Sequence, residues 1–511
     1  MRYDRALTLA ALLLAGLAAP AAAAPGDQLF AGRQVHAIDI VFTQPAWWDS
    51  LVAFYEAGEE RYLPATVVVN GDTLTRVGVR LKGNSSYTHP NDKKPFRLAF
   101  DEFLGSQRLD GLKGVHLNNC WRDPTFLREK LHLDFLRQAG IPAPRGNFAT
   151  VTLNGQPWGF YSLVEHVDKT FLSSRFGDKD GGFFKAVDGL PPSQVLSDFR
   201  WYGPDAAAYA DRYEIKSDDE DESWEQLLAV LDTLEHSGDL AASLPEVVSL
   251  DRFCRAMAAD NILGNLDAYA CSGRNFYAYF DEPGGKMEWI AWDTGLSFGG
   301  YDTDLPDPRT LSPVFVYDAA GRPLLGKVLA NPALRRAYLD AYAALFRGTF
   351  SAPAMLEGIE TLAALARPFV QADPRKMYSN AQFEASLSAD ITEGGRRIPG
   401  LRSFVSGRAA SIESQLAALE APPGPTVSLA QNHPNPAASR TTIAFGLATA
   451  GRARLEVFDL AGRRVATLAD GERAAGPHAV EADVSGLGPG LYFYRLRSAA
   501  GEATRRMIVL P

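Results

Sequence analysis

The sequence predicts an α+β protein: a two-lobed α+β domain followed by a small all-β sandwich. Three observations support this class. Strand-like runs dominate residues 35–165, and amphipathic helical runs dominate residues 221–420. After residue 428 the chain changes to short alternating strands separated by Gly or Asp turns. Successive strand-rich and helix-rich stretches are typical of α+β domains, and short, regularly spaced strands are typical of a sandwich.

The N-terminus has the features of an export signal. Arg2 and Arg5 precede an apolar run over residues 6–19, and small residues follow at 21–24. A charged start, a short apolar run and an A-x-A site are typical of a secretory signal peptide. A membrane anchor is the alternative, but a spanning helix needs roughly 20 apolar residues. We expect a signal peptide over residues 1–24 and no transmembrane segment in the mature chain.

The first lobe is predicted to consist mainly of strands. Residues 35–42 and 65–81 contain apolar or alternating runs, with the helical stretch PAWWDSLVAFYEAG between them. Further strand signals follow at 96–100 and 114–117. The runs FATVTLN and GFYSLVE flank Asn154-Gly155, a dipeptide typical of a tight hairpin turn.

A helix is predicted over residues 123–139. Asp123 is a good N-cap, and Pro124 suits the first helical turn. Apolar side chains then repeat at helical spacing up to the stop at Gly140: Leu127, Leu131 and Phe135. Glu129 on this helix is a candidate to orient a phosphate-binding lysine, with an ordinary solvated glutamate as the alternative.

The most informative segment is residues 265–300. Asp267 and Asn275 precede a predicted strand rich in Phe and Tyr, and Asp293 follows a second strand beyond the DEPGGK turn. Phosphoryl transfer to a hydroxyl needs a carboxylate to accept the proton, and an Asn and an Asp to hold Mg²⁺. Protein kinases present these residues in this order. Asp267 is therefore the candidate catalytic residue, and Asn275 and Asp293 are the candidate metal ligands.

A polar loop within residues 78–100 is a candidate phosphate-binding element. Backbone amides, hydroxyl groups and lysines in such a loop can cover and pair with phosphates. The spacing is neither that of a G-x-G-x-x-G loop nor that of a P-loop, and an ordinary hairpin with exposed lysines is the alternative. Its candidate residues are Ser85, Ser86, Lys93 and Lys94.

Further charged residues lie at the ends of predicted elements. Glu165 closes the strand GFYSLVE and Lys185 closes GGFFK, so both are candidates for a nucleotide site, with structural strand-end residues as the alternative. The acidic run 217–223 precedes a helix, where carboxylates complement the helix dipole. A later loop offers Asp302 or Asp304 to a cation.

Composition limits the class of partner and of reaction. A net charge of -10 and a pI near 5.4 argue against nucleic acid as a partner, because no overall basic field attracts phosphates. Three cysteines allow at most one disulfide and show no metal-binding spacing. The sequence lacks a G-x-S-x-G elbow, an H-E-x-x-H motif and a dinucleotide fingerprint, which disfavours those hydrolase, protease and Rossmann classes.

Five ordered motifs within residues 35–420 resemble the spore-coat protein H (CotH) kinase family, an atypical branch of the kinase-like fold. The motifs read RLKGNSS…KKPFRLAF, DPTFLREKLHLDFLRQAGIPAPR, WGFYSLVEHVDKTFLSSRFG…GGFFK, NLDAYACSGRNFYAYFD and WIAWDTGLSFGG. The resemblance implies a kinase domain over residues 25–420 that transfers the γ-phosphate of ATP to Ser or Thr hydroxyls of secreted or envelope proteins. It implies Mg²⁺ as cofactor, with Mn²⁺ as an alternative ion. Two alternatives are a kinase-like surface adhesin or structural envelope protein without phosphotransfer, and a carbohydrate-associated envelope module.

The resemblance also implies roles for the candidate residues. Lys94 or Lys93 would contact the nucleotide phosphates. Glu129 or Glu165 would orient that lysine. The implied catalytic and metal-binding residues are Asp267, Asn275 and Asp293.

Two departures from kinase patterns concern the same segment. Ordinary kinases place their Asn five positions after the catalytic Asp, whereas Asn275 lies eight positions after Asp267. The resembled family commonly has Trp-Asp-x-Asp, whereas this chain has Gly295 at the second acid. If that acid is a required ligand, the metal site is weakened, or Asp302 or Asp304 replaces it.

The C-terminal part is predicted to be a separate module. Residues 421–428 are a Pro-rich linker, and residues 429–511 contain the short strands. LAQNHPNPAASRTTIAF, RLEVFDLAGRRVATL and GLGPGLYFYRL resemble the FlgD-like immunoglobulin fold and the C-terminal sorting domain of type IX secretion. The resemblance implies the secretion machinery as a partner and a secreted or cell-surface location.

Overall fold

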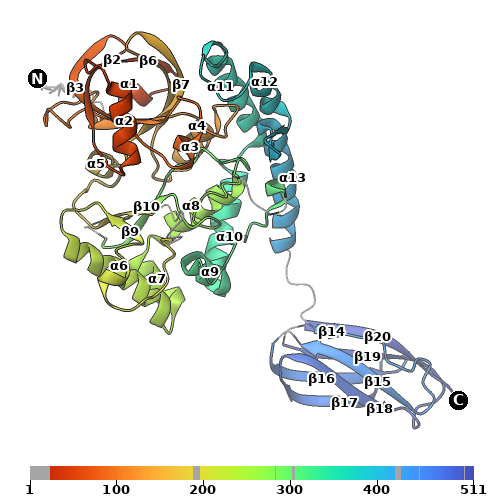
Figure 1. The fold of residues 1–511 in the computed structure, drawn as a ribbon. Coiled ribbons are helices and arrows are strands. Elements are labelled where there is room, and N and C mark those ends of the chain that lie inside the picture. Colours follow the sequence, from red (N-terminus) through yellow and green to blue (C-terminus); the bar gives the residue numbers. More distant parts are fainter. Residues whose placement is uncertain are drawn as a thin grey trace, which may run out of the picture. The chain divides into compact units, whose positions relative to one another are not determined.

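The computed structural model describes residues 24–187, 196–281, 284–301, 305, 307–420, 427–447, 449–499 and 501–511 (Figure 1). The chain forms two compact units that divide between Leu416 and Ala417. Nearly all of the predicted signal peptide (residues 1–23) and most of the predicted linker (residues 421–426) lie outside the described residues. The observed class is a mixed α+β unit followed by an all-β unit.

Seven strands of the first unit close into a barrel of order β1-β2-β3-β4-β5-β7-β6. They are β1 (Val35–Val41), β2 (Leu63–Val69), β3 (Asp72–Leu81), β4 (Phe96–Ala99), β5 (Gly114–Asn118), β6 (Gly146–Leu153) and β7 (Gln156–Glu165). Parallel pairing of β1 with β6 closes the barrel. Alternate side chains such as Ile38 and Ile40 on β1 point inward and are buried. The strands predicted for the first half are confirmed.

Three short helices accompany the barrel: α1 (Asp27–Phe30), α2 (Trp47–Glu56) and α3 (Ser85–Thr88). Helix α2 confirms the helical stretch predicted between the first two strands. It lies against the barrel (Figure 1), and its Leu51 is buried in the barrel core.

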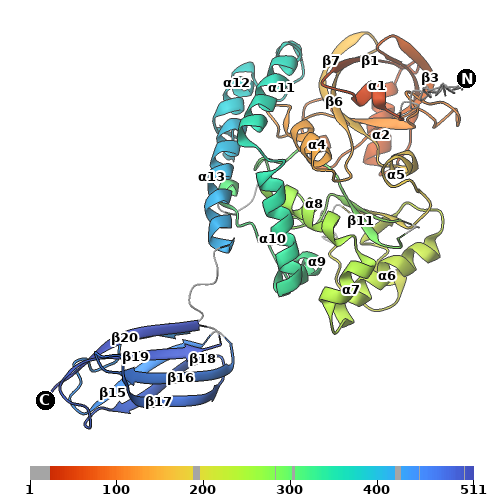
Figure 2. The same ribbon diagram turned by 180° about the vertical axis from the view of Figure 1, so that it is seen from behind.

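Helix α4 (Arg128–Gln138) lies between the barrel and the helical part of the same unit (Figures 1 and 2). The predicted helix is confirmed, but its start is corrected from Asp123 to Arg128. The Asp123 carboxylate accepts hydrogen bonds from the backbone N–H groups of Thr125 and Arg128, each at 2.9 Å, and so caps a turn before the helix. Phe126 in this turn has a φ of 63°, outside the right-handed helical region.

The rest of the first unit contains a four-stranded sheet of order β11-β10-β8-β9. Its strands are β8 (Phe183–Ala186), β9 (Tyr213–Ile215), β10 (Phe276–Phe280) and β11 (Met287–Ala291). Strands β10 and β11 pair antiparallel from Phe276 opposite Ala291 to Phe280 opposite Met287, which confirms the predicted hairpin.

Helices form most of the remaining first unit. They are α5 (Lys169–Phe176), α6 (Glu220–His236), α7 (Leu240–Val247), α8 (Leu250–Ile262), α9 (Pro323–Ala330), α10 (Pro332–Arg347), α11 (Ala352–Ala372), α12 (Asn380–Ser388) and α13 (Leu401–Glu420), with short strands β12 (Ile391–Glu393) and β13 (Arg396–Ile398). The single helical stretch predicted near 325–348 is two helices, α9 and α10. Asn331 ends the first and caps the second through its side chain, and Pro332 takes the first helical position.

The second unit consists of two antiparallel sheets that share one core. One sheet has the order β14-β15-β18, and the other has the order β17-β16-β19-β20. The strands are β14 (Val427–Leu429), β15 (Arg440–Leu447), β16 (Gly451–Phe458), β17 (Arg464–Arg473), β18 (Gly476–Asp483), β19 (Gly490–Ser498) and β20 (Gly501–Val509). Ile443 and Phe445 of β15 share a buried cluster with Leu455 of β16 and Tyr494 of β19. The prediction of an all-β C-terminal part is confirmed.

Candidate active site

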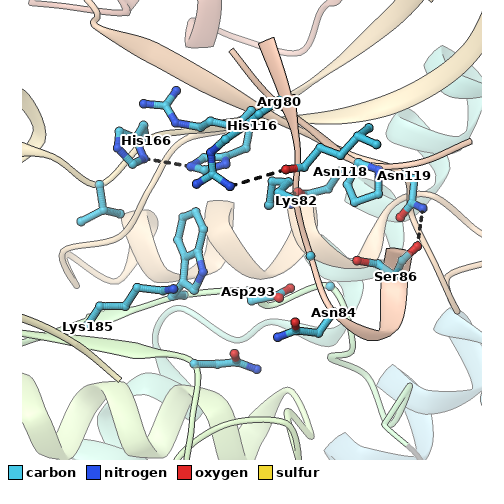
Figure 3. Close-up of a pocket in the computed structure, with 18 of the residues that line it drawn as sticks. Arg80, Lys82, Asn84, Ser86, His116, Asn118, Asn119, His166, Lys185 and Asp293 are labelled. Carbon is cyan, nitrogen blue, oxygen red and sulfur yellow. Dashed lines mark hydrogen bonds between the residues drawn. The ribbon is translucent and has the colours of Figure 1, made fainter. Parts of the chain in front are cut away.

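A cavity of about 740 Å³ lies within the first unit (Figure 3). This volume is within the usual range for small-molecule sites. Its walls come from the barrel edge at the ends of β3 and β5, the loop after β3, helix α4, and the open end of the β10–β11 hairpin. The predicted site residues that line it are Ser85, Ser86, Glu129, Lys185, Asp267, Asn275 and Asp293.

The hairpin brings Asn275 and Asp293 to one end of the sheet. Asn275 directly precedes β10 and Asp293 follows β11 by two residues, so the pairing of these strands places them close together. The backbone N–H of Trp292 donates to the carbonyl oxygen of Asn275 at 3.1 Å. Asn275 and Asp293 have φ values of 63° and 51°, a left-handed conformation that is uncommon outside glycine and is enriched at functional sites.

Asn275 is held in a way that leaves its side-chain oxygen for a ligand. Its Nδ2 donates to the backbone oxygen of Asp267 at 2.7 Å. This bond orients the amide and links the candidate metal ligand directly to the candidate catalytic residue. Together, the Oδ1 of Asn275 and the carboxylate of Asp293 suit Mg²⁺, which commonly binds one or two carboxylates plus substrate phosphates.

Within the described ranges, no group of three or more His, Cys, Asp or Glu side chains is arranged to hold a metal ion. Asp302 and Asp304, the alternative acids, lie outside the described residues.

Asp267 is a nearly buried carboxylate beside a cation. Its Oδ1 lies 3.5 Å from Nε of Arg274, and within the described part of the chain this oxygen accepts no hydrogen bond. The pKa of Asp267 is raised to about 7, chiefly by burial, with the charge of Arg274 opposing the shift and the negative charge of Asp293 adding to it. A carboxyl group with this pKa can accept a proton near neutral pH.

Lys82 also lines the cavity, although it is not among the lysines predicted from the sequence. Its Nζ donates to Oδ1 of Asn118 at 2.7 Å (Figure 3). Nδ2 of Asn118 in turn donates to the Glu129 carboxylate at 2.9 and 3.1 Å. Burial lowers the pKa of Lys82 to about 8, while the charges of Asp293 and Glu129 oppose that shift. Burial, followed by the charge of Asp293, raises the pKa of Glu129 to about 7.

Strand order brings these groups together. Leu81 pairs with Phe96, and Phe96 pairs with Leu117, so the residues that follow β3 and β5 share one barrel edge. The sequence signal that could have pointed to Lys82 is its position between a strand and the Gly83 loop. That β4 pairs with both β3 and β5 is visible only in the tertiary structure.

Lys93 and Lys94 do not line the cavity, which corrects their assignment to the phosphates. Lys93 is fully buried, and its Nζ forms an ion pair with Oδ2 of Asp373 at 2.6 Å. Nζ of Lys94 donates to the backbone oxygens of Tyr87 and His89. Both ammonium groups are therefore used to fold the loop between β3 and β4.

Glu165 also lies outside the cavity, whereas Glu129, the other predicted glutamate, lines it. The Glu165 carboxylate is buried and accepts hydrogen bonds from Nε of Arg145 at 2.9 Å and Nη2 of Arg175 at 3.0 Å. These two arginines give it a structural role. Lys185 does reach the cavity from β8 (Figure 3), and its Nζ lies 3.4 Å from Oε2 of Glu214.

One wall of the cavity is aromatic, a feature without a clear sequence motif. Nε2 of His116 and Nδ1 of His166 share a hydrogen bond of 2.8 Å (Figure 3). The His116 ring also meets the Trp292 ring edge-on, with centroids 5.0 Å apart. Burial, followed by nearby cationic groups, holds the pKa of both histidines well below the usual value, so the imidazoles are neutral.

The acidic run at 217–223 has the structural role that was favoured for it. Asp219 caps helix α6 by accepting from the backbone N–H of Glu222 at 3.1 Å. Gly295 lines the cavity, and a Cβ atom built there would lie 4.0 Å from Oδ1 of Asp293, the nearest atom among the described residues. The second acid of the Trp-Asp-x-Asp pattern would therefore stand next to Asp293.

Several relatives with curated descriptions are similar to this chain. Inner spore coat protein H of Bacillus subtilis is 24% identical over 322 residues, covering 63% of this chain and 85% of that protein. Spore coat protein homolog 1 of Rhizopus delemar is 23% identical over 329 residues, covering 60% and 52%. Invasin CotH2 of the same fungus is 22% identical over 257 residues, covering 49% and 42%. This chain spans about half the length of the two fungal relatives.

One solved structure that matches this chain is that of a Helicobacter pylori proinflammatory kinase, CtkA. It has a TM-score of 0.31 and 9% identity, covering 66% of this chain and 94% of that one.

Two family matches divide the chain in the same order as its units. A secretion system C-terminal sorting domain matches residues 432–510, which implies export to the cell surface or secretion, with secretion machinery as a partner. Across the described ranges, the helices are too short or too polar to cross a membrane. The CotH kinase protein family matches residues 79–412, which contain every residue of the cavity named above. The chain therefore belongs to the CotH kinase protein family.

Proposed function

We propose that this protein is an exported atypical kinase that transfers the γ-phosphoryl group of ATP to Ser or Thr hydroxyls of secreted or envelope proteins. The observation that carries the proposal is the shared cavity of Lys82, Glu129, Asp267, Asn275 and Asp293. Phosphoryl transfer depends mainly on positioning and on charge stabilisation, and these residues supply both. The proposal includes a two-lobed kinase-like domain, an N-terminal signal peptide and an immunoglobulin-like C-terminal sandwich.

Each side chain has a role in this proposal. Lys82 would leave Asn118 to pair with phosphate oxygens, and Glu129 would hold its ammonium group through Asn118 or directly. The loop with Ser85 and Ser86 would cover the phosphates. Because the Lys82 pKa is about 8, the side chain is largely protonated at neutral pH and can pair with an anion.

Asp267 would accept the proton of the substrate hydroxyl. Its pKa of about 7 matches a general base that works near neutral pH. Asn275 and Asp293 would hold Mg²⁺ or Mn²⁺, which when bound neutralises charge on the phosphates. Arg274, 3.5 Å from the Asp267 carboxylate, favours the ionised form of this base.

The test uses the mature chain, residues 25–511, with labelled ATP and Mg²⁺ or Mn²⁺. We expect label transfer to itself or to a protein substrate, and loss of at least about 10²-fold in Asp267→Asn and Asp293→Asn. Lys82→Met should lose transfer to a similar degree, whereas Lys327→Met, which changes a lysine on helix α9 outside the cavity, should retain it. Absence of both transfer and a nucleotide-dependent thermal shift in the wild type would refute the kinase proposal.

The second candidate is a surface protein without phosphotransfer. It is favoured by Gly295, which leaves the site with one acid at the Trp-Asp-x-Asp position. The printed names of some fungal relatives, such as Invasin CotH2, also fit a surface role. Nucleotide binding without transfer in the wild type would support this candidate.

A further inference from the structure

Two polar segments carry the residues of the proposed reaction. We call residues 260–267, which lead to Asp267, the catalytic segment, and residues 293–299, which begin with Asp293, the metal segment. Their backbones pair directly: N–H of Phe298 donates to the Leu263 oxygen at 2.6 Å, and N–H of Gly299 donates to the Gly264 oxygen at 3.1 Å. These bonds join the segments several residues away from the two aspartates.

Helix α4 reaches the same place with two buried side chains. Nη1 of Arg128 donates to the carbonyl oxygens of Ser297 at 2.9 Å and Phe298 at 3.0 Å. One turn later, His132 is fully buried, with Nδ1 hydrogen-bonded to Oγ of Ser297. The other ring nitrogen, Nε2, lies 3.5 Å from Oδ1 of Asp260. His132 therefore lies between the metal segment and the catalytic segment.

The hydrogen-bond pattern fixes the protonation of the ring. Oγ of Ser297 donates its only proton to the backbone oxygen of Thr294 at 2.6 Å, so it must accept from Nδ1–H of His132. Burial lowers the pKa of His132 to about 3, so the imidazole is neutral and its Nε2 is an acceptor. Among the described residues Nε2 accepts no hydrogen bond, and the polar atom given beside it is Oδ1 of Asp260 at 3.5 Å. Burial raises the pKa of the Asp260 carboxyl to about 7, so near neutral pH a large fraction of this group carries a proton that can face Nε2.

The path continues from Asp260 towards the catalytic residue. Oδ1 of Asp260 accepts a hydrogen bond from Nδ2 of Asn265 at 2.8 Å. The backbone N–H of Asn265 donates to the backbone carbonyl oxygen of Asp260, also at 2.8 Å. Asn265 is buried and lies two residues before Asp267. A buried path of polar contacts thus runs from Thr294, next to Asp293, to the loop of Asp267.

We propose that His132 is a positioning residue that fixes the metal segment against the catalytic segment and keeps the two aspartates at a constant separation. This inference rests on the proposed phosphoryl transfer for its functional meaning. In-line transfer needs base and phosphate aligned closely, and a displacement of about 1 Å can cost about 10²-fold in rate. A purely structural need at this buried position would be met by an apolar side chain, without the cost of burying polar groups.

The backbone pairs and the Arg128 contacts remain when His132 is changed, so variants are expected to fold. In the mature chain, His132→Asn keeps a donor towards Ser297 but cannot reach Asp260. We expect kcat for ATP to fall about 10- to 100-fold with KM for ATP changed less than about threefold. Asp260→Ala should have the same effect, and the double variant should lose no more, because both changes cut one path.

A conservative variant provides a rescue control. Asp260→Asn places an amide donor opposite Nε2 and keeps a carbonyl oxygen for Asn265, so it should retain kcat within about threefold. The matched structural control is His36→Asn, another buried histidine with two hydrogen bonds, to Leu29 and Asn70, on the barrel strand β1. It should lower thermal stability without changing kcat.

A second readout does not depend on phosphotransfer. Amide hydrogen exchange over residues 294–298 should become about tenfold faster in His132→Asn and in Asp260→Ala, but not in His36→Asn. Faster exchange with a wild type that neither transfers phosphate nor binds ATP would refute the kinase proposal and support the physical link. Unchanged exchange and kcat in His132→Asn, or additive losses in the double variant, would overturn the role of His132.

Discussion

Asp267 must be both buried and ionised to act as a base. Burial raises its pKa to about 7, with Asp293 adding to the shift and Arg274 opposing it. A general base works unprotonated, so kcat/KM should rise with pH through about 7 and fall below it. Arg274→Gln removes the opposing charge and should therefore shift the rise of kcat/KM to higher pH. A pH–rate profile that is the same in Arg274→Gln and in wild type would contradict this assignment.

Stability should depend on pH in the opposite direction. The pKa of Glu129 is raised to about 7 by burial and then by Asp293, so the folded chain holds this proton more tightly than the unfolded chain. The resulting stabilisation is complete below about pH 4 and is lost as the pH rises through about 7. Without nucleotide, we expect the melting temperature to fall over this window less in Glu129→Gln than in wild type. Equal slopes in thermal melts from about pH 5 to 8 would rule this out.

Gly295 offers a gain-of-function test of the metal site. Among the described residues a side chain there has room, since the nearest of their atoms to an added Cβ is Oδ1 of Asp293 at 4.0 Å. Gly295→Asp should lower the Mg²⁺ concentration for half-maximal thermal shift with ATP by about tenfold, or about 1.4 kcal/mol. Without metal, the same variant should be less stable, because two carboxylates repel each other. In the neutral control Gly295→Asn, both the gain in Mg²⁺ affinity and the loss of stability without metal should be smaller than in Gly295→Asp.

The loop between β3 and β4 is joined to helix α11 by a buried ion pair. Lys93 and Asp373 are both fully buried in their side chains, and the Asp373 carboxylate also accepts from N–H of Phe160 at 2.9 Å and of Arg375 at 2.8 Å. Removing one partner leaves an uncompensated buried charge. Asp373→Ala should therefore lower the free energy of unfolding by about 3–5 kcal/mol in urea titrations.

An exposed pair on the same helix serves as the control for that prediction. Nε of Arg367 on α11 lies 2.7 Å from Oε1 of Glu384 on α12, and these side chains are 36% and 42% exposed. Glu384→Ala should change the free energy of unfolding by at most about 1 kcal/mol. Similar losses in both variants would show that burial of the Lys93 pair is not what stabilises the loop.

The chain consists of two compact units with separate cores, and this predicts separable functions. A chain ending at residue 420 should keep nucleotide binding and transfer at close to the level of the mature protein. In cells, the same truncation should prevent delivery to the surface or medium, because the sorting domain at 432–510 is missing. Fractionation with an immunoblot measures this. Normal delivery of the truncated chain would show that the second unit is not needed for export.

The sequence by itself determined the order of elements and most of the acidic site. Apolar alternation predicts the barrel strands and the β10–β11 hairpin because side-chain period is a local property. Asn275 and Asp293 flank the paired strands, so their convergence follows from hairpin pairing, whereas Asp267 is brought to them by the hydrogen bond from Nδ2 of Asn275 to its backbone oxygen. The division into an α+β part and an all-β part follows from the same local patterns.

Only the tertiary structure decided which of several similar charges belong to the cavity. Lys93 finds its partner Asp373 at a separation of 280 residues, and Lys82 meets Glu129 through Asn118 on another strand. A lysine or glutamate has the same local pattern whether it faces a cavity or a buried counter-charge. Strand order and burial make that choice, because they set which charge each group meets and how much water it loses. The link through His132 was undetectable from sequence for the same reason.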